Sequence, residues 1–137
     1  MTVIITDTGF GTDDWTKGYV PANEAANDEL SLDVASDADP ATLVEHLTGV
    51  EMIRVDFPSF ADGRGFTIAR QLRLAGYKGR LRARGHVISD QYAMARRSGF
   101  DEVEINDELA ERQPEAEWLA RANWQAHDYQ ARMRGSA

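Results

Sequence analysis

The sequence predicts an α/β protein of about four strand–helix units with a mainly parallel sheet, followed by a long C-terminal helix. Two observations predict this class. Short alternating or apolar segments recur at intervals of roughly 22–25 residues, and each precedes a segment with helical periodicity. Strands that alternate with helices pair in parallel through right-handed crossovers. Four units are too few for an eightfold barrel, so we expect a small open sheet, or a half-barrel that pairs with a second copy.

The chain of 137 residues suits one domain with a core of useful size, and its hydrophobic content of 42% is typical of soluble globular proteins. We divide it into an N-terminal arm (residues 1–28), an α/β core (29–113) and a C-terminal helix (114–137). The arm is expected to lie at the periphery, with a short strand near residues 3–5 and Trp15 as its packing anchor.

The first unit is a strand at residues 30–34, where polar and apolar residues alternate, and a helix at about 41–47. Asp37 or Asp39 can cap this helix, because a carboxylate accepts hydrogen bonds from free backbone amides of the first turn. Pro40 suits its first position, and Gly49 is a good stop.

The second unit contains the stretch around which we expect the protein to be organised. Residues 50–57 are rich in branched side chains and predict a buried strand, which Pro58 ends because proline cannot donate to a sheet ladder. Asp62 is expected to cap the next helix. Gly63 and Gly65 allow a tight turn or a close backbone approach that a side chain would block.

The third strand, at residues 80–86, alternates so that Arg80, Arg82, Arg84 and His86 point the same way. Arginines cannot be buried unpaired, so this row must face solvent, acidic partners or an anion.

A helix at about 90–97, a strand at 100–105 and a cap at Asn106 or Asp107 complete the core. A helical apolar stripe then predicts one helix from residue 114 to about 134, which docks on the domain or on a second subunit.

The net charge of −8 argues against nucleic-acid binding, which draws on a basic surface. Residues 54–97 nevertheless hold ten basic and three acidic residues, so the rest of the chain carries a surplus of 15 negative charges. This distribution indicates either a local anion pocket or internal pairing between the middle and the flanks. The absence of cysteine excludes a catalytic thiol and a disulfide framework, and no targeting or membrane segment is evident, so we expect a cytoplasmic protein.

Ligands of such folds gather at the carboxyl ends of the strands, which here carry an acid, two glycines and several arginines. The candidate anion-binding residues are Gly63, Arg64, Gly65, Arg82 and Arg84. Arginine suits an oxyanion because its planar fork gives two parallel hydrogen bonds. The alternative is a structural turn in which Asp62 pairs with a nearby arginine and no ligand binds.

A catalytic reading uses Asp62 or Asp56 as general base and His86 as proton carrier. It ranks below anion binding, because arginines near a carboxylate lower its pKa and weaken it as a base. The spacing matches neither the phosphate-binding loop nor the dinucleotide fingerprint, no metal site is predicted, and the cofactor stays unknown.

Residues 57–66 (FPSFADGRGF) and a set of later positions resemble a bacterial family of domains of unknown function. The later positions include Ala69, Arg70, Leu72, Arg73, Gly76, Tyr77, Gly79, Leu81, Arg82, Gly85, Asp90, Gln91, Arg97, Gly99 and Phe100. The resemblance covers residues 30–104, and the Asp13-Asp14-Trp15 run is similar to an acidic segment of the family. Genes of that family lie beside sulfite reductase genes, and its members are labelled as oxidoreductases of sulfite reduction. The resemblance therefore implies a setting rather than a mechanism.

Three functions remain open on this basis. The first is an accessory protein of assimilatory sulfite reduction that binds an oxyanion, or the reductase itself, through the arginines. The second is a small oxidoreductase or lyase-type enzyme. The third is a non-catalytic assembly module, for which sulfite reductase, another enzyme of sulfur assimilation or a second copy of the chain is the partner.

Overall fold

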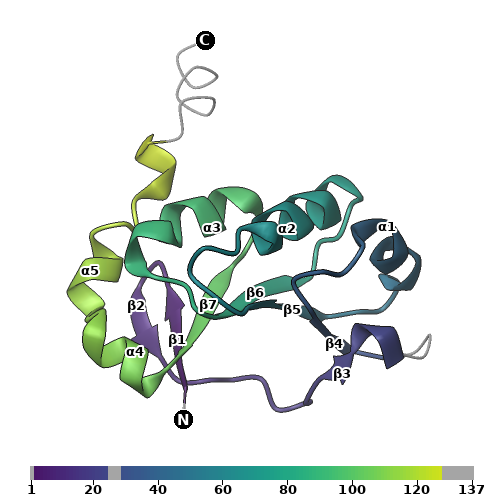
Figure 1. The fold of residues 1–137 in the computed structure, drawn as a ribbon, viewed down its shortest axis with the longest axis horizontal. Helices are drawn as coiled ribbons and strands as arrows, with labels where there is room; N and C mark the ends of the chain where they lie inside the picture. The colour runs from purple at the N-terminus through teal and green to yellow at the C-terminus, as the bar shows by residue number, and fades with distance from the viewer. Residues whose placement is uncertain (1, 25–28, 128–137) are drawn as a thin grey trace.

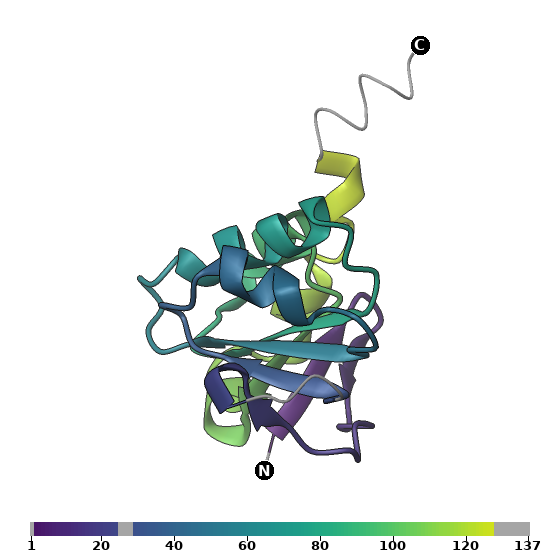
Figure 2. The same ribbon diagram turned by 90° about the vertical axis from the view of Figure 1, so that its right-hand side faces the viewer.

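The computed structural model of the protein describes residues 2–24 and 29–127. These residues form one mixed sheet of seven strands in the order β2-β1-β7-β6-β5-β4-β3, with helices packed against it (Figures 1 and 2). The strands are β1 (Thr2–Thr6), β2 (Gly9–Gly11), β3 (Val20–Pro21), β4 (Ser31–Val34), β5 (Met52–Phe57), β6 (Arg80–Gly85) and β7 (Glu102–Asn106).

Five α-helices connect or flank the strands: α1 (Pro40–Leu43), α2 (Arg64–Leu74), α3 (Tyr92–Ser98), α4 (Asp107–Arg112) and α5 (Glu115–Leu119). Short 3-10 turns lie at Ala22–Glu24 (η1), Val44–His46 (η2), Ser89–Gln91 (η3) and Trp124–His127 (η4). Within the described ranges, none of these helices is long and apolar enough to cross a membrane. The predicted caps at Asp39 and Asn106 are confirmed, since their side chains accept hydrogen bonds from the amides of Ala41 and Leu109.

The sheet is mixed, so the expectation of a mainly parallel sheet is wrong. Strands β3 to β7 pair in parallel in chain order, but β1 runs antiparallel to both β7 and β2. The N-terminal residues therefore extend the sheet by three strands rather than forming a peripheral arm. Ile5 explains this in part, because it lies opposite Val103 and packs into the common core.

Helices α1, α2 and α3 all cover the same face of the sheet (Figure 1). Each connects two adjacent parallel strands, and each crossover adds the next strand on the same side. With right-handed crossovers, this progression puts every connecting helix on one face. The core between helices and sheet includes Ile53, Val55, Phe57, Leu72 and Leu81, all at most 1% exposed.

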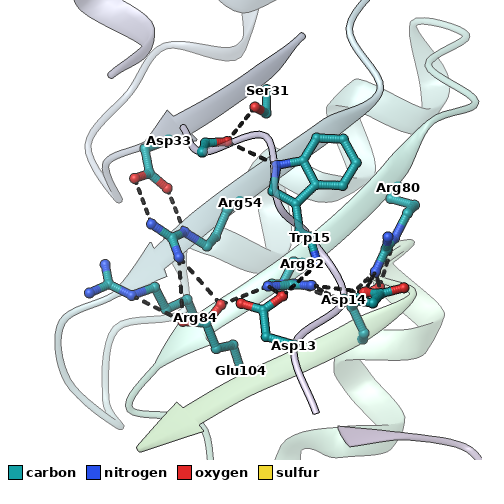
Figure 3. A network of polar contacts seen from close by, with 12 residues as sticks. Asp13, Asp14, Trp15, Ser31, Asp33, Arg54, Arg80, Arg82, Arg84 and Glu104 are labelled. Atoms are coloured by element: carbon teal, nitrogen blue, oxygen red, sulfur yellow. Dashed lines mark hydrogen bonds and ion pairs between the residues drawn. The ribbon is translucent and has the colours of Figure 1, made fainter. Parts of the chain in front are cut away.

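Among the described residues, no α-helix connects strands across the other face of the sheet. The segment between β2 and β3 crosses it instead, and we call residues 13–19 the strap (Figures 1 and 3). Two hydrogen bonds fix its turn: Trp15 Nε1 and Ser31 Oγ both donate to the carbonyl of Gly18, over 2.9 and 2.5 Å.

The expectation of one long C-terminal helix is also wrong. Helix α5 ends at Leu119, and the following residues make turns whose amides bond three residues back, from Arg121 to Trp118 and from Ala122 to Leu119. Trp118 holds α5 against the domain. Its ring is buried against Tyr92, and its Nε1 donates to the carbonyl of Gln113. The rest of the predicted helix, residues 128–134, lies outside the described residues.

Candidate functional site

The loop of residues 58–64, which we call the strand-end loop, leaves β5 at its carboxyl end and leads into α2. Its fold is fixed by Asp62. One carboxylate oxygen accepts from the backbone amide and the Nε of Arg64 (3.1 and 3.0 Å), and the other accepts from Arg64 Nη2 (2.8 Å). The same Nη2 donates to Ser36 Oγ after β4, over 3.0 Å. The expectation that Asp62 is the N-cap of α2 is wrong by one residue, because the N-cap position is held by Gly63. The Asp62 carboxylate nevertheless occupies the helix start, where an external anion was expected.

The pairing with Arg64 also decides what Asp62 can do as an acid or base. The hydrogen bonds from the Arg64 side chain, then that from its backbone amide, hold the pKa of Asp62 far below its usual value. A carboxylate held ionised in this way is a weak proton acceptor near neutral pH. The alternative in which Asp62 stabilises the turn by pairing with an arginine matches the contacts of the loop.

Phe60 is an exposed aromatic residue of the strand-end loop. Its side chain is 45% exposed, and its ring packs edge-on against His86 with 5.2 Å between ring centroids. Its backbone carbonyl accepts from Gln91 Nε2 over 3.0 Å, which ties the loop tip to the start of α3. His86 lies next to this ring, with Nδ1 3.3 Å from the carbonyl of Phe57.

Two of the glycines near this edge occupy positions where a side chain would collide with the backbone or ring of Phe57. A Cβ at Gly65 would lie 2.4 Å from the ring of Phe57, so Gly65 lets α2 approach the end of β5. A Cβ at Gly85 would lie 2.7 Å from the carbonyl oxygen of Phe57, and Gly85 has a φ of 116° that L side chains rarely adopt. This backbone turn ends β6, so the predicted alternation does not continue to His86. A Cβ at Gly63 would meet only the ring of Phe66, at an ordinary contact distance of 3.9 Å.

The arginine row of β6 lies on the strap-covered side, which we call the polar sheet face (Figure 3). Arg82 is at its centre and is 0% exposed. Its Nε donates to Glu102 over 2.7 Å, and its Nη1 donates to Glu104 over 2.9 Å and to Asp13 of the strap over 3.0 Å. Its Nη2 lies 2.7 Å from Glu102 but makes no hydrogen bond of good geometry. Burial alone would lower the pKa of Arg82, but these carboxylates outweigh it and raise the pKa.

Two more arginines of this face form hydrogen bonds to carboxylates that are as short as those of Arg82. Arg80 donates to Glu102 over 2.7 Å and to Asp14 of the strap over 2.9 Å. Arg54 on β5 grips both oxygens of Asp33 over 2.6 and 2.8 Å. The Arg54 guanidinium also stacks on the ring of Tyr19 in the strap, 3.7 Å from its centroid. Burial raises the pKa of that phenol to about 12, so it stays protonated.

Arg84 differs from the other arginines of the row. Its side chain is 47% exposed, and its closest carboxylate oxygens are 3.7 Å away on Glu104 and 4.0 Å away on Asp56. Within the described part of the chain its guanidinium makes no hydrogen bond. Its place on β6 beside Asp56 on β5 follows from the parallel register.

The surplus of basic residues at positions 54–97 was explained either by an anion pocket or by internal ion pairs. The contacts of Arg54, Arg80 and Arg82 match internal ion pairs. The partners of the arginines come from β4, β7 and the strap, and Asp13 and Arg82 are 69 positions apart. Sequence reasoning did not identify Asp13, Asp14, Glu102 and Glu104 as these partners. The available signal was the alternation of Glu102 and Glu104 in a predicted strand next to the arginine strand.

The predicted site residues do not open onto one shared hollow. A cavity of about 380 Å³ is lined by Arg84 but by neither Arg64 nor His86. A cavity of about 220 Å³ is lined by Phe60 and His86 but by none of the arginines of the row. Asp62 and His86 are joined by no hydrogen bond or ion pair among the described residues, and the same residues hold no group of three His, Asp or Glu side chains arranged for a metal ion.

Comparison with known proteins gives one match. No curated protein and no solved structure matches the chain. A family model described as "Bacterial protein of unknown function (DUF934)" matches residues 31–137, which include β4 to β7 and the strand-end loop but not the strap. Since this match spans more than half of the sequence, the chain belongs to the DUF934 family of bacterial proteins.

Proposed function

We propose that this protein is a non-catalytic accessory protein that binds a protein partner through the strand-end loop. The observation that carries the proposal is the exposed ring of Phe60 on a loop that is held rigid from both sides, by the Asp62–Arg64–Ser36 contacts and by Gln91. Aromatic and arginine side chains supply most binding hot spots, and a pre-ordered loop loses little entropy on binding. Arg64 belongs to the same loop, and its side chain is 61% exposed.

The family resemblance makes assimilatory sulfite reductase the first partner to test, in the cytoplasm. Docking through the loop fits the contacts better than the two alternatives. Oxyanion binding by the arginine row would require Arg82 to leave its carboxylates. Catalysis by Asp62 and His86 would require a carboxylate whose oxygens are not already engaged by Arg64.

The test is binding of purified assimilatory sulfite reductase to the immobilised full chain, measured by biolayer interferometry. We expect Phe60→Ala to weaken binding at least about tenfold, which corresponds to roughly 1.4 kcal/mol. Leu74→Ala is the matched control, because Leu74 is an exposed apolar residue at the other end of α2 and should change binding less than about twofold. Equal affinity of the Phe60→Ala variant and wild type, or no binding of wild type, contradicts the proposal.

A further inference from the structure

The cavity beside Arg84 is a second candidate site, and it lies apart from the strand-end loop. It has a volume of about 380 Å³ and lies at the carboxyl ends of β4, β5 and β6, beside β3 and η1. This volume is within the range of small-molecule sites, roughly 300–1,000 Å³. Its apolar lining comes from Ala22, Val34, Ala35 and Ala38.

The polar groups at this cavity carry both signs of charge. Arg84 presents a guanidinium whose nearest carboxylate oxygens are 3.7 and 4.0 Å away, whereas Arg54, Arg80 and Arg82 each have one within 2.7 Å. Its fork is therefore free to take a carboxylate through two parallel hydrogen bonds. Arg84 is the arginine of the row that the fold leaves for a ligand.

Two carboxylates at the cavity also make no hydrogen bond to a cation among the described residues. Asp56 is 46% exposed, and its ion-pair contact with Arg84 is long, at 4.0 Å. Asp37 lies on the lining from the segment after β4. Its charge adds to the effect of Asp62 in raising the pKa of Arg64, but no hydrogen bond joins Asp37 to Arg64. Asp33 lines the cavity too, but Arg54 neutralises it through two hydrogen bonds. The charged groups of the cavity that have no hydrogen-bonded charge partner thus carry two negative charges and one positive charge.

From this arrangement we propose that the cavity binds a basic amino acid. Its carboxylate pairs with Arg84, its two ammonium groups pair with Asp56 and Asp37, and its aliphatic part lies on the alanines and Val34. A ligand with one carboxylate and two amines carries a net charge of +1, which neutralises the surplus negative charge of the site. Sulfate and sulfite are disfavoured, because the acids outnumber the arginine. This binding is independent of partner docking at Phe60.

The test uses L-lysine as the probe, with titration calorimetry on the full chain and 1,5-diaminopentane as the analogue that lacks the carboxylate. We expect saturable lysine binding with a Kd near or below about 1 mM, and at least tenfold weaker binding of the diamine. Arg84→Gln should weaken lysine binding at least about tenfold but leave the diamine unchanged, because only lysine uses the guanidinium. Asp56→Asn should weaken both ligands.

Arg70→Gln on the exposed side of α2 is the control and should bind lysine like wild type. The proposal is overturned by any of three results: no saturable lysine binding up to about 10 mM, unchanged lysine binding in both Arg84→Gln and Asp56→Asn, or tighter binding of sulfate than of lysine. Circular dichroism of each variant verifies the fold, and the exposed positions of Arg84 and Asp56 make unfolding unexpected.

Discussion

Replacing Arg82 by methionine removes the charge at the centre of the polar sheet face but keeps most of the aliphatic side chain. The change leaves Glu102 and Glu104 without their central partner, although both are nearly buried, at 4% and 3% exposed. It also removes the hydrogen bond of 3.0 Å from Arg82 Nη1 to the carboxylate of Asp13, which ties the strap to the sheet. The variant therefore tests whether this buried cluster holds the strap and the sheet together.

The expected magnitude follows from the burial of the pairs. Removing one partner of a buried ion pair costs roughly 3–5 kcal/mol, because the other charge is left desolvated. Stability of a small domain is about 5–15 kcal/mol in total, so Arg82→Met should remove a large part of it. The same substitution at Arg84 should cost about 1 kcal/mol or less, because that side chain is 47% exposed and its carboxylate contacts are 3.7 Å or longer.

The assay is urea unfolding followed by tryptophan fluorescence, with Arg84→Met as the matched control. A double variant, Arg82→Met with Glu104→Gln, should regain part of the loss because it removes one stranded charge. A single Arg82→Met variant that loses less than about 1 kcal/mol would refute the reasoning. It would mean that Arg80, which contacts Glu102, and Arg54, which contacts Glu104, suffice to neutralise these glutamates without Arg82.

Three further predictions concern other parts of the fold. Gly85→Ala should lower stability by about 1–3 kcal/mol in the same assay, because its Cβ would meet the carbonyl of Phe57 at a positive φ; an unchanged urea midpoint would contradict the backbone geometry. Trp118→Ala should cost about 3–5 kcal/mol, since the ring that docks α5 is buried; a loss below about 1 kcal/mol would show that α5 docks without it. Burial raises the pKa of Asp7, but the hydrogen bond from Tyr92 and a nearby guanidinium outweigh it and keep the pKa below the usual 3.8. The stability from Asp7 is therefore complete above pH 3.8 and lost as the pH falls through the lowered pKa, so the difference in urea midpoint between wild type and Asp7→Asn should shrink in acid; a constant difference from pH 7 to pH 3 would contradict it.

The elements themselves could be predicted from the sequence where local rules decide. The strand expected at residues 50–57 is β5 (Met52–Phe57), and the one expected at 80–86 is β6 (Arg80–Gly85). The cap at Asp39 follows from short-range chemistry, because its carboxylate accepts from the amide of Ala41. The antiparallel pairing of β1 with the far side of β7 could not be predicted in the same way, because strand pairing depends on partners distant in the sequence.

The candidate site was predictable only as a set of residue types. Alternation put three arginines on one side of β6, and this is what the structure contains. It could not say whether an anion, water or the protein's own carboxylates would meet them. The answer depends on a strap that begins 69 positions earlier and on the glutamates of the next strand.

The sequence by itself determined the α/β class, most strand and helix positions and the arginine row, because propensity, capping and two-residue alternation act over a few residues. The tertiary structure decided that the connecting helices share one face, that the N-terminal strap covers the other, and that Arg84 alone of the row keeps an open fork. Burial and ion pairing depend on which distant segments meet across the sheet, and that is settled only when the strands have assembled.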